Sequence, residues 1–340
     1  MTSVADNKIL TRKSSAAPAP MNPRILLVFL AMLVGLAAPA AAWPERPVRL
    51  VVPYAPGGPV DLISRLVADR LSARFGQTFV IENKPGANGA IGVQAVMSNP
   101  ADGYTLLMHA SAGITIYQAV TAQPAFDTLR DLTPVSMVSY FDLVLCANPD
   151  APFENVKGFV DYARAHPGKL SYGSAGIGAL NHVGTERFKT MNGINIVHVP
   201  YRGDAPVAAD LINGTIGIAF VSSNVAIPFI KSGKLRALAV PRKTRLPVLP
   251  DVPTMAEQGF PDFELRPWAA FFGPKGLSPD IVQSMVAALK DILVQPDLVA
   301  QLAGFGMEAS SSTPEMLAET VRANTALWKD VAAKAQIFVE

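Results

Sequence analysis

The chain of 340 residues carries 29 lysines and arginines against 27 aspartates and glutamates, a formal net charge of +2 at pH 7. This balance leaves no basic face of the size that a nucleic-acid-binding protein needs to neutralise phosphates. The single cysteine, Cys146, excludes a disulfide framework and a thiolate metal site within the chain, and we expect it to be a small buried thiol.

The N-terminal region has the pattern of a secretory signal peptide. Basic residues between positions 12 and 24 precede the apolar run from Ile25 to Ala38, and three alanines that end at Ala42 are the small side chains that a signal peptidase reads. At about 14 residues, the apolar run is shorter than the roughly 20 residues of a membrane-spanning helix. We therefore expect export of the chain and cleavage after Ala42, with Met21 as an alternative start of translation.

Strand and helix patterns alternate along residues 43–340, which are enough for two α/β domains or one large one. Most strand candidates are nearly continuous apolar runs, as expected of parallel strands that are buried on both faces. The expected strands are Val48–Pro53, Phe79–Ile81, Thr105–Met108, Leu143–Ala147, Lys169–Tyr172, Ile196–Val199, Ile216–Val221, Leu235–Val240 and Ala269–Phe272.

Capping residues mark several helices. The first helix is expected to begin after Gly58 and to end at Gly76. The sequence Ser278-Pro279-Asp280 combines a capping residue, a proline at the first helical position and an acid near the positive end of the helix dipole. The sequence 313–315, Thr-Pro-Glu, repeats this pattern before the last helix.

Two turns from a strand into a helix are rich in glycine, one ending at Gly58 and the other spanning Ser171 to Gly184. Glycine lets a ligand approach the backbone closely, and the unpaired N–H groups of a helix start can bind an anion. Either turn alone is equally compatible with a plain strand-to-helix connection. Two such turns, on different halves of the chain, favour one anionic ligand held between facing helix N-termini.

Seven segments, met in order along the chain, resemble the Bug-type solute receptors, the TctC-like binding proteins of tripartite tricarboxylate transport systems. The resemblance covers nearly all of residues 43–340 and rests on the set rather than on any one motif. The segments are VVPYAPGGPVDLISR, ENKPGANGAIG, PADGYTLL, YGSAGIGALNHV, HVPYRGDAPVAADLINGTIGIAF, GKLRALAV and DVPTMAEQGFPDFELRPWAAFFGPKGLSPDIV.

The resemblance implies an α/β fold, periplasmic binding protein type II-like, with two α/β domains and a ligand cleft between them. Domain 1 would comprise residues 43–142 plus 270–340, and domain 2 residues 143–269, with hinge crossings near 143–147 and 264–272. Such a protein is a monomeric periplasmic receptor that binds a small carboxylate and delivers it to the permease subunits of a membrane transporter. We expect no metal, cofactor or nucleic acid in this role.

The resemblance also assigns candidate ligand-binding residues to four short segments. The first two are the glycine-rich turns, the third is the end of the sequence HVPY with the loop that follows it, and the fourth lies in the sequence HASAG. The candidates are Tyr54, Ala55, Pro56, Gly57, Gly58, Asp61, Ser111, Ala112, Ser174, Ala175, Gly176, Tyr201, Arg202 and Gly203.

The chain departs from common family patterns at three positions. It has Gly217 where members often have aspartate, Asn88 where they often have glycine, and Ala179 where a hydroxyl residue is common. These differences bear on the identity of the ligand more than on the fold.

Several candidate side chains have a structural alternative. Asp61 either meets an amino or hydroxyl group of the ligand, or fixes the loop and stabilises the helix start. Arg202 either makes a bidentate contact to a carboxylate or forms a surface ion pair with Asp204 or Asp210. Ser174 either donates to a carboxylate or caps a helix.

An exported hydrolase and a solute sensor are the alternatives to a transport receptor. The sequence YGSAG around Ser174 is similar to a nucleophile elbow, but Tyr172 stands where that motif needs glycine, which disfavours an exported hydrolase. His182 is expected to be a packed, hydrogen-bonded residue rather than a metal ligand, because no histidine here has metal-ligand spacing. A solute sensor that signals to another protein remains an alternative that the sequence does not distinguish from a transport receptor.

Overall fold

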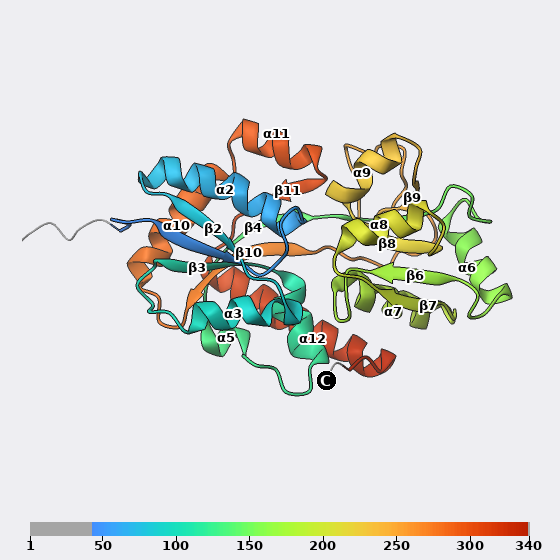
Figure 1. Cartoon of the computed structure of the whole chain (residues 1–340), viewed down its shortest axis with the longest axis horizontal. Helices are drawn as coiled ribbons and strands as arrows, with labels where there is room; N and C mark the ends of the chain where they lie inside the picture. The colour runs from blue at the N-terminus through green and yellow to red at the C-terminus, as the bar shows by residue number, and fades with distance from the viewer. Residues whose placement is uncertain (1–42, 339–340) are drawn as a thin grey trace, which may run out of the picture. The chain divides into compact units, whose positions relative to one another are not determined.

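A computed structural model describes residues 43–338, and the predicted signal peptide lies outside the described residues (Figure 1). Within this part of the chain the strands form two sheets, and helices flank each sheet. None of the helices described here has both the length and the apolar character to cross a bilayer.

The first sheet has six strands in the order β11-β4-β10-β3-β1-β2. Its strands are β1 (Val48–Val52), β2 (Phe79–Asn83), β3 (Thr105–Ala110), β4 (Leu132–Phe141), β10 (Trp268–Pro274) and β11 (Met307–Ala309). The helical segments associated with it are α2 (Pro59–Phe75), η1 (Ala87–Gly89), α3 (Ala90–Met97), η2 (Ala112–Ile116), α4 (Tyr117–Val120), α5 (Thr128–Asp131), α10 (Pro279–Ile292), α11 (Pro296–Gly304) and α12 (Pro314–Ala335).

The second sheet has five strands in the order β7-β6-β8-β5-β9. Its strands are β5 (Leu143–Ala147), β6 (Ser171–Ser174), β7 (Val197–Pro200), β8 (Ile218–Ser222) and β9 (Arg236–Ala239). The helices around it are α6 (Val156–Ala165), α7 (Leu180–Asn192), α8 (Asp204–Ile212) and α9 (Ser223–Lys231).

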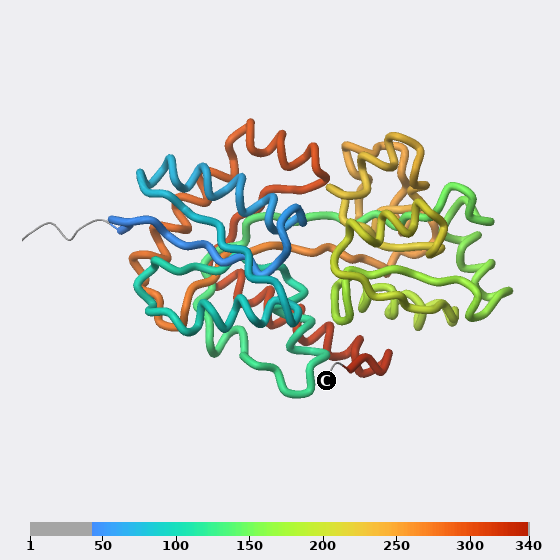
Figure 2. The backbone as a smooth tube through the Cα atoms, in the orientation of Figure 1, coloured from blue at the N-terminus to red at the C-terminus, as the bar shows by residue number. Residues whose placement is uncertain are grey.

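The chain passes between the two sheets twice, as the green and orange parts of the tube show (Figure 2). One passage is at Asp142, between β4 and β5, and the other lies between β9 and β10. The end of α12 also reaches the second sheet, because Trp328 and Val331 belong to the same apolar cluster as Val183 of α7.

Each sheet has an apolar cluster on both faces. In β5 the side chains alternate, so that Leu143 and Leu145 join one cluster while Val144 and Cys146 join the other. Cys146 is fully buried, and its burial raises the pKa of the thiol. The prediction of a buried structural thiol is therefore confirmed.

The predicted strands and capped helices are all present, with ends displaced by a few residues. The helix α2 does end at Gly76, which adopts the left-handed conformation (φ 68°) and donates to the carbonyl of Ser72. The α/β fold class is confirmed. Two strands, β4 and β11, were not predicted, and β4 contains Pro134 at a point where its register against β10 shifts.

The expectation of parallel strands is only partly right. In the first sheet β1 pairs in parallel with β2 and β3, and in the second sheet β6 does so with β7 and β8. The strands β5 and β10 are antiparallel to both of their neighbours. The reason is that the chain enters these two strands from the other sheet, without the helical crossover within one sheet that a parallel connection requires.

Candidate functional site

A pocket of about 840 Å³ lies where loops of the first sheet meet loops of the second. Its wall includes the N-termini of three helices, α2, α7 and α8, of which the first follows β1 and the second follows β6. It is lined by residues 53–60, 85–89, 110, 112–113, 141, 143, 175, 178–181, 201–206, 222, 225 and 267. Ligands of α/β proteins commonly bind at such strand ends, so this pocket is the candidate site.

The first glycine-rich turn is held by Asp61. Gly57 has a positive φ of 89°, and its amide donates to the buried Asp61 carboxylate at 3.0 Å. Arg65 and Asn83 also donate to this carboxylate, at 2.9 Å each. Burial alone would raise the pKa of Asp61, but these hydrogen bonds lower it. Asp61 does not line the pocket, so its contacts are those of the loop-fixing alternative.

Beneath this turn, Tyr54 lies against a buried histidine. The Tyr54 hydroxyl is 2.9 Å from Nδ1 of His109, which sequence reasoning did not single out. Burial lowers the pKa of His109 to about 4, so its ring is neutral at pH 7. Nδ1 also lies 3.0 Å from the carbonyl oxygen of Ala110, so the tautomer of the ring decides whether Nδ1 accepts from the tyrosine or donates to this carbonyl. A Cβ on Gly89 or Gly113 would overlap the imidazole, which explains why glycine stands at both positions.

The second glycine-rich turn is held by side chains of α7. The Ala175 amide donates to Oδ1 of Asn181 at 3.1 Å, and the Gly178 amide donates to Nδ1 of His182 at 3.1 Å. His182 is therefore a packed, hydrogen-bonded residue, as predicted. No cluster of three metal-ligating side chains occurs within residues 43–338.

Ser174 also has a structural environment. Its Oγ is 2.7 Å from Nε2 of His198, whose ring stacks on His182 with 4.1 Å between centroids. Ser174 is completely buried and lies outside the pocket lining, so a substrate in the pocket could not reach its hydroxyl. Burial lowers the pKa of His198 to about 4. The serine–histidine pair thus lacks the access that a nucleophile needs.

Arg202 and Asp204 are the charged side chains of the pocket lining. Asn181 donates to one carboxylate oxygen of Asp204 at 3.0 Å, and Ser222 donates to the other. Burial raises the pKa of Asp204 despite these bonds. Asp210 instead accepts from the hydroxyl of Tyr201 at 2.6 Å. Neither of these two acids pairs with Arg202. Among residues 43–338 the Arg202 guanidinium forms no ion pair and no hydrogen bond with any other side chain or with the backbone.

Most of the predicted site residues come together at the pocket. Those that line it are Tyr54, Ala55, Pro56, Gly57, Gly58, Ala112, Ala175, Tyr201, Arg202 and Gly203. Asp61, Ser111, Ser174 and Gly176 do not line it. Ser111 is buried, and its Oγ accepts from the Trp268 amide at 3.3 Å.

Sequence reasoning missed several lining residues. Asn181 and Asp204 lie in the first turns of α7 and α8. Their positions at helix starts, close to glycines, could have identified them as lining residues from the sequence. Phe141, Leu143 and Pro267 lie where the chain passes between the sheets. Leu143 and Pro267 fall in the expected hinge crossings, but none of the three was assigned to the ligand site.

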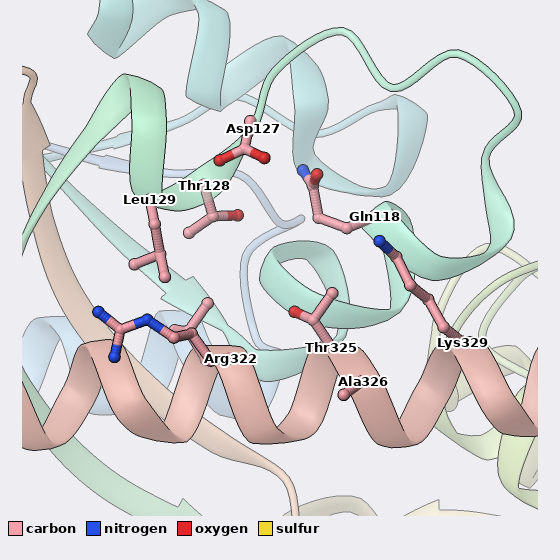
Figure 3. A pocket seen from close by; sticks show the side chains of 9 residues that line it. Gln118, Asp127, Thr128, Leu129, Arg322, Thr325, Ala326 and Lys329 are labelled. Carbon is pink, nitrogen blue, oxygen red and sulfur yellow. The ribbon is translucent and has the colours of Figure 1, made fainter.

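A second pocket, of about 310 Å³, lies beside α12 (Figure 3). Arg322 and Lys329 of α12 border it, together with Gln118, Asp127 and Thr128 from the facing segment. None of the predicted site residues lines it, and the helix that begins beside it, α5, has four residues. The larger pocket is therefore the better candidate for ligand binding.

Comparisons with known proteins identify the family. The family model described as "Tripartite tricarboxylate transporter family receptor" matches residues 63–336. Protein BugT of Bordetella pertussis is 34% identical over 301 residues, covering 87% of this chain and 92% of BugT.

Two solved structures of Rhodopseudomonas palustris proteins have the same fold. Rpa4515 with adipate is 35% identical with a TM-score of 0.82, covering 87% of this chain and 99% of that chain. MatC with bound malate is 29% identical with a TM-score of 0.79, covering 85% and 99%. The chain therefore belongs to the receptor family of the tripartite tricarboxylate transporters.

Proposed function

We propose that this protein is an extracytoplasmic receptor that binds a small carboxylate in the 840 Å³ pocket and delivers it to a membrane transporter. The observation that carries the proposal is the unpaired guanidinium of Arg202 in a pocket where three helices begin. The family membership and the acids named with the related structures, adipate and malate, support the same ligand class.

The pocket supplies enough interaction for carboxylate binding. The first-turn amides of a helix have no partner within the helix, and a helix dipole contributes roughly 0.3 to 1 kcal/mol to a bound anion. A bidentate guanidinium contact adds charge-assisted hydrogen bonds of about 1.5 to 3 kcal/mol each. A micromolar complex needs about 8 kcal/mol in total, so a few such contacts and some apolar burial suffice.

In this proposal the two sheets with their helices act as two domains, joined at Asp142 and between β9 and β10. The receptor works in the periplasm after cleavage behind Ala42, as a monomer that hands its ligand to permease subunits and performs no catalysis. The loop amides of Gly57, Ala175 and Gly178 are already bonded within the protein, which makes the turns rigid around the ligand. The remaining first-turn amides of α2, α7 and α8 are those that face the acid group.

The test is a thermal-shift screen of mono- and dicarboxylates, followed by titration calorimetry of each acid that raises the melting temperature. Arg202→Ala should weaken binding by about 1.5 to 3 kcal/mol, whereas Arg74→Ala, which removes an exposed charge at the far end of α2, should leave affinity unchanged. The proposal would be contradicted if Arg202→Ala bound the acid as tightly as the unmodified protein, or if no carboxylate in the screen bound at all.

A further inference from the structure

Asp204 places a carboxyl group in the wall of the large pocket. Of the described residues that line this pocket it is the only acid, and within residues 43–338 no basic side chain pairs with it. Asp204 is the first residue of α8 and is partly exposed, whereas its partners Asn181 and Ser222 are buried. A ligand that fills the pocket therefore lies against an acidic group that the protein does not neutralise.

The carboxylate of Asp204 keeps hydrogen-bonding capacity for a ligand. Asn181 donates to one oxygen at 3.0 Å, the Ser222 hydroxyl donates to the other, and the Ser222 amide also contributes. The two oxygens of a carboxylate accept about four hydrogen bonds in total, so these three donors leave at least one lone pair. Because Asp204 lines the pocket and is partly exposed, a ligand can supply the missing donor.

Asn88 adds free capacity from the loop after β2. One N–H of its side-chain amide donates to the carbonyl of Ile177 at 2.9 Å, and among residues 43–338 its second N–H and its side-chain carbonyl have no partner. A side-chain amide both donates and accepts, so it can serve a polar substituent in either sense. The polar groups that a ligand can use thus come from loops of both sheets.

An unsubstituted acid is a poor match for this lining. When such an acid fills the pocket, it removes water from Asp204 without offering a donor in return, and its own negative charge repels the carboxylate. An acid with a hydroxyl or amino group supplies the donor and reduces this repulsion. Burial raises the pKa of Asp204, so the charged carboxylate is costly without a further donor and is stabilised by one.

Arg202 and Asp204 lie on either side of Gly203, at the start of α8. Because they are two residues apart, their Cα atoms are separated by no more than about 7.6 Å. One small ligand can therefore meet both side chains, with its acid group at Arg202 and a substituent on a nearby carbon at Asp204. A site that hydrogen-bonds a polar group of its ligand rejects the analogue that lacks it, because the protein's own group is then left unpaired.

Resting on the proposed function, we infer that Asp204 determines specificity by accepting a hydrogen bond from a hydroxyl or amino group that the ligand carries close to its acid group. The ligand class is then the small hydroxy or amino acids, in preference to unsubstituted acids. Two variants of Asp204 address this contact. Asp204→Ala removes the acceptor, and Asp204→Asn keeps an acceptor oxygen but removes the charge.

The test is calorimetric titration of protein purified from expression of the full chain with matched acids. Succinate, malate and aspartate share one diacid skeleton, with no substituent, a hydroxyl or an amino group. Butanoate, 2-hydroxybutanoate and 2-aminobutanoate are the matching monoacids, and the same comparison is made for every acid that the carboxylate screen detects. We expect a substituted acid to bind at least about tenfold more tightly than its unsubstituted counterpart, the effect of one hydrogen bond to a charged group.

Asp204→Ala should bring this affinity ratio close to one. The matched control is Asp280→Ala, which removes an exposed acid from the first turn of α10 and should keep the ratio. Both affinities of a ratio are measured on the same variant, so a partial loss of folded protein does not change it. A ratio that falls in Asp204→Asn identifies the amino group as the donor, and a ratio that is retained there identifies the hydroxyl, because an amide oxygen still accepts from it.

The outcomes separate this inference from the proposed function. If the unsubstituted acids bind as tightly as the substituted ones, or if the preference persists in Asp204→Ala, the inference is wrong and the carboxylate receptor stands. Binding that is weakened in Arg202→Ala but unchanged in Asp204→Ala leads to the same conclusion. If none of these acids binds and the wider carboxylate screen gives no response, both the inference and the proposed function are wrong.

Discussion

The side-chain amide of Asn88 donates a hydrogen bond of 2.9 Å to the carbonyl oxygen of Ile177, joining the loop after β2 to the second glycine-rich turn. Asn88 adopts a left-handed conformation (φ 51°, ψ 31°), and both segments border the same pocket. The contact therefore links loops of the two sheets across the ligand site.

Removing this donor is expected to weaken ligand binding. Asn88→Gly keeps the positive φ without strain, and Asn88→Asp keeps the shape but cannot donate when ionised. A net hydrogen bond is worth about 0.5 to 1.5 kcal/mol, so both variants should bind a carboxylate a few-fold less tightly, through faster dissociation in stopped-flow experiments. If both variants released the ligand at the same rate as the unmodified protein, the Asn88–Ile177 hydrogen bond would not stabilise the ligand-bound state.

Gly58 tests whether the first turn faces the ligand. Its φ of −76° is open to any residue, and a Cβ there would have only the Ala55 carbonyl nearby, at 3.8 Å. Gly58→Val should thus fold normally by circular dichroism while losing most of its ligand affinity, because Gly58 lines the pocket. The matched control is Gly304→Val at the end of α11, where a Cβ meets nothing within 4 Å. Equal affinity in the two variants would argue against a ligand at this turn.

Asp61 should contribute mainly to stability. Asp61→Ala removes the acceptor for the Gly57 amide, for Asn83 and for Arg65, and should lower the free energy of unfolding by about 1.5 to 3 kcal/mol. The control is Asp69→Ala, which changes an exposed residue two turns further along α2 and should leave the free energy of unfolding nearly unchanged. Urea denaturation at pH 7 measures both. Because the folded pKa of Asp61 is lowered, the difference between wild type and Asp61→Ala should shrink as the pH falls below about 4.

The stacked histidines predict an acid sensitivity. Burial lowers the pKa of His198 to about 4, with further lowering by His182 and Lys189 and opposition from Glu186. The unfolded chain, with an ordinary histidine pKa of about 6.5, binds the proton first. The stability that the neutral ring contributes is therefore complete above pH 6.5 and is lost as the pH falls from about 6.5 to about 4.

The measurement is the urea midpoint at several pH values for wild type and two variants. His198→Gln should lose less stability than wild type between pH 6.5 and 4, because it lacks this titration. His166→Gln changes an exposed histidine and should keep the pH profile of wild type. Identical profiles for all three proteins would show that His198 does not titrate as its burial requires.

Local patterns in the sequence were sufficient for most of the elements and for the α/β class, but not for the strands β4 and β11. Apolar runs identified strands such as β5, and capping residues such as Ser278 and Gly76 placed helix ends, because these signals act over a few neighbouring residues. The glycine-rich turns could likewise be picked out from their own residues, whereas Arg202 was assigned by the resemblance to the receptor family.

Only the tertiary structure decided which groups meet. Tyr54 and His109 are 55 positions apart, and Asn88 and Ile177 are 89 apart, so no local period connects them. The same holds for the hydrogen bonds of Asp204 with Asn181 and Ser222, which lie 23 and 18 positions away in the chain. Such contacts depend on the path of the chain between two sheets, and hydrogen bonds that form over these separations leave no pattern in the sequence itself.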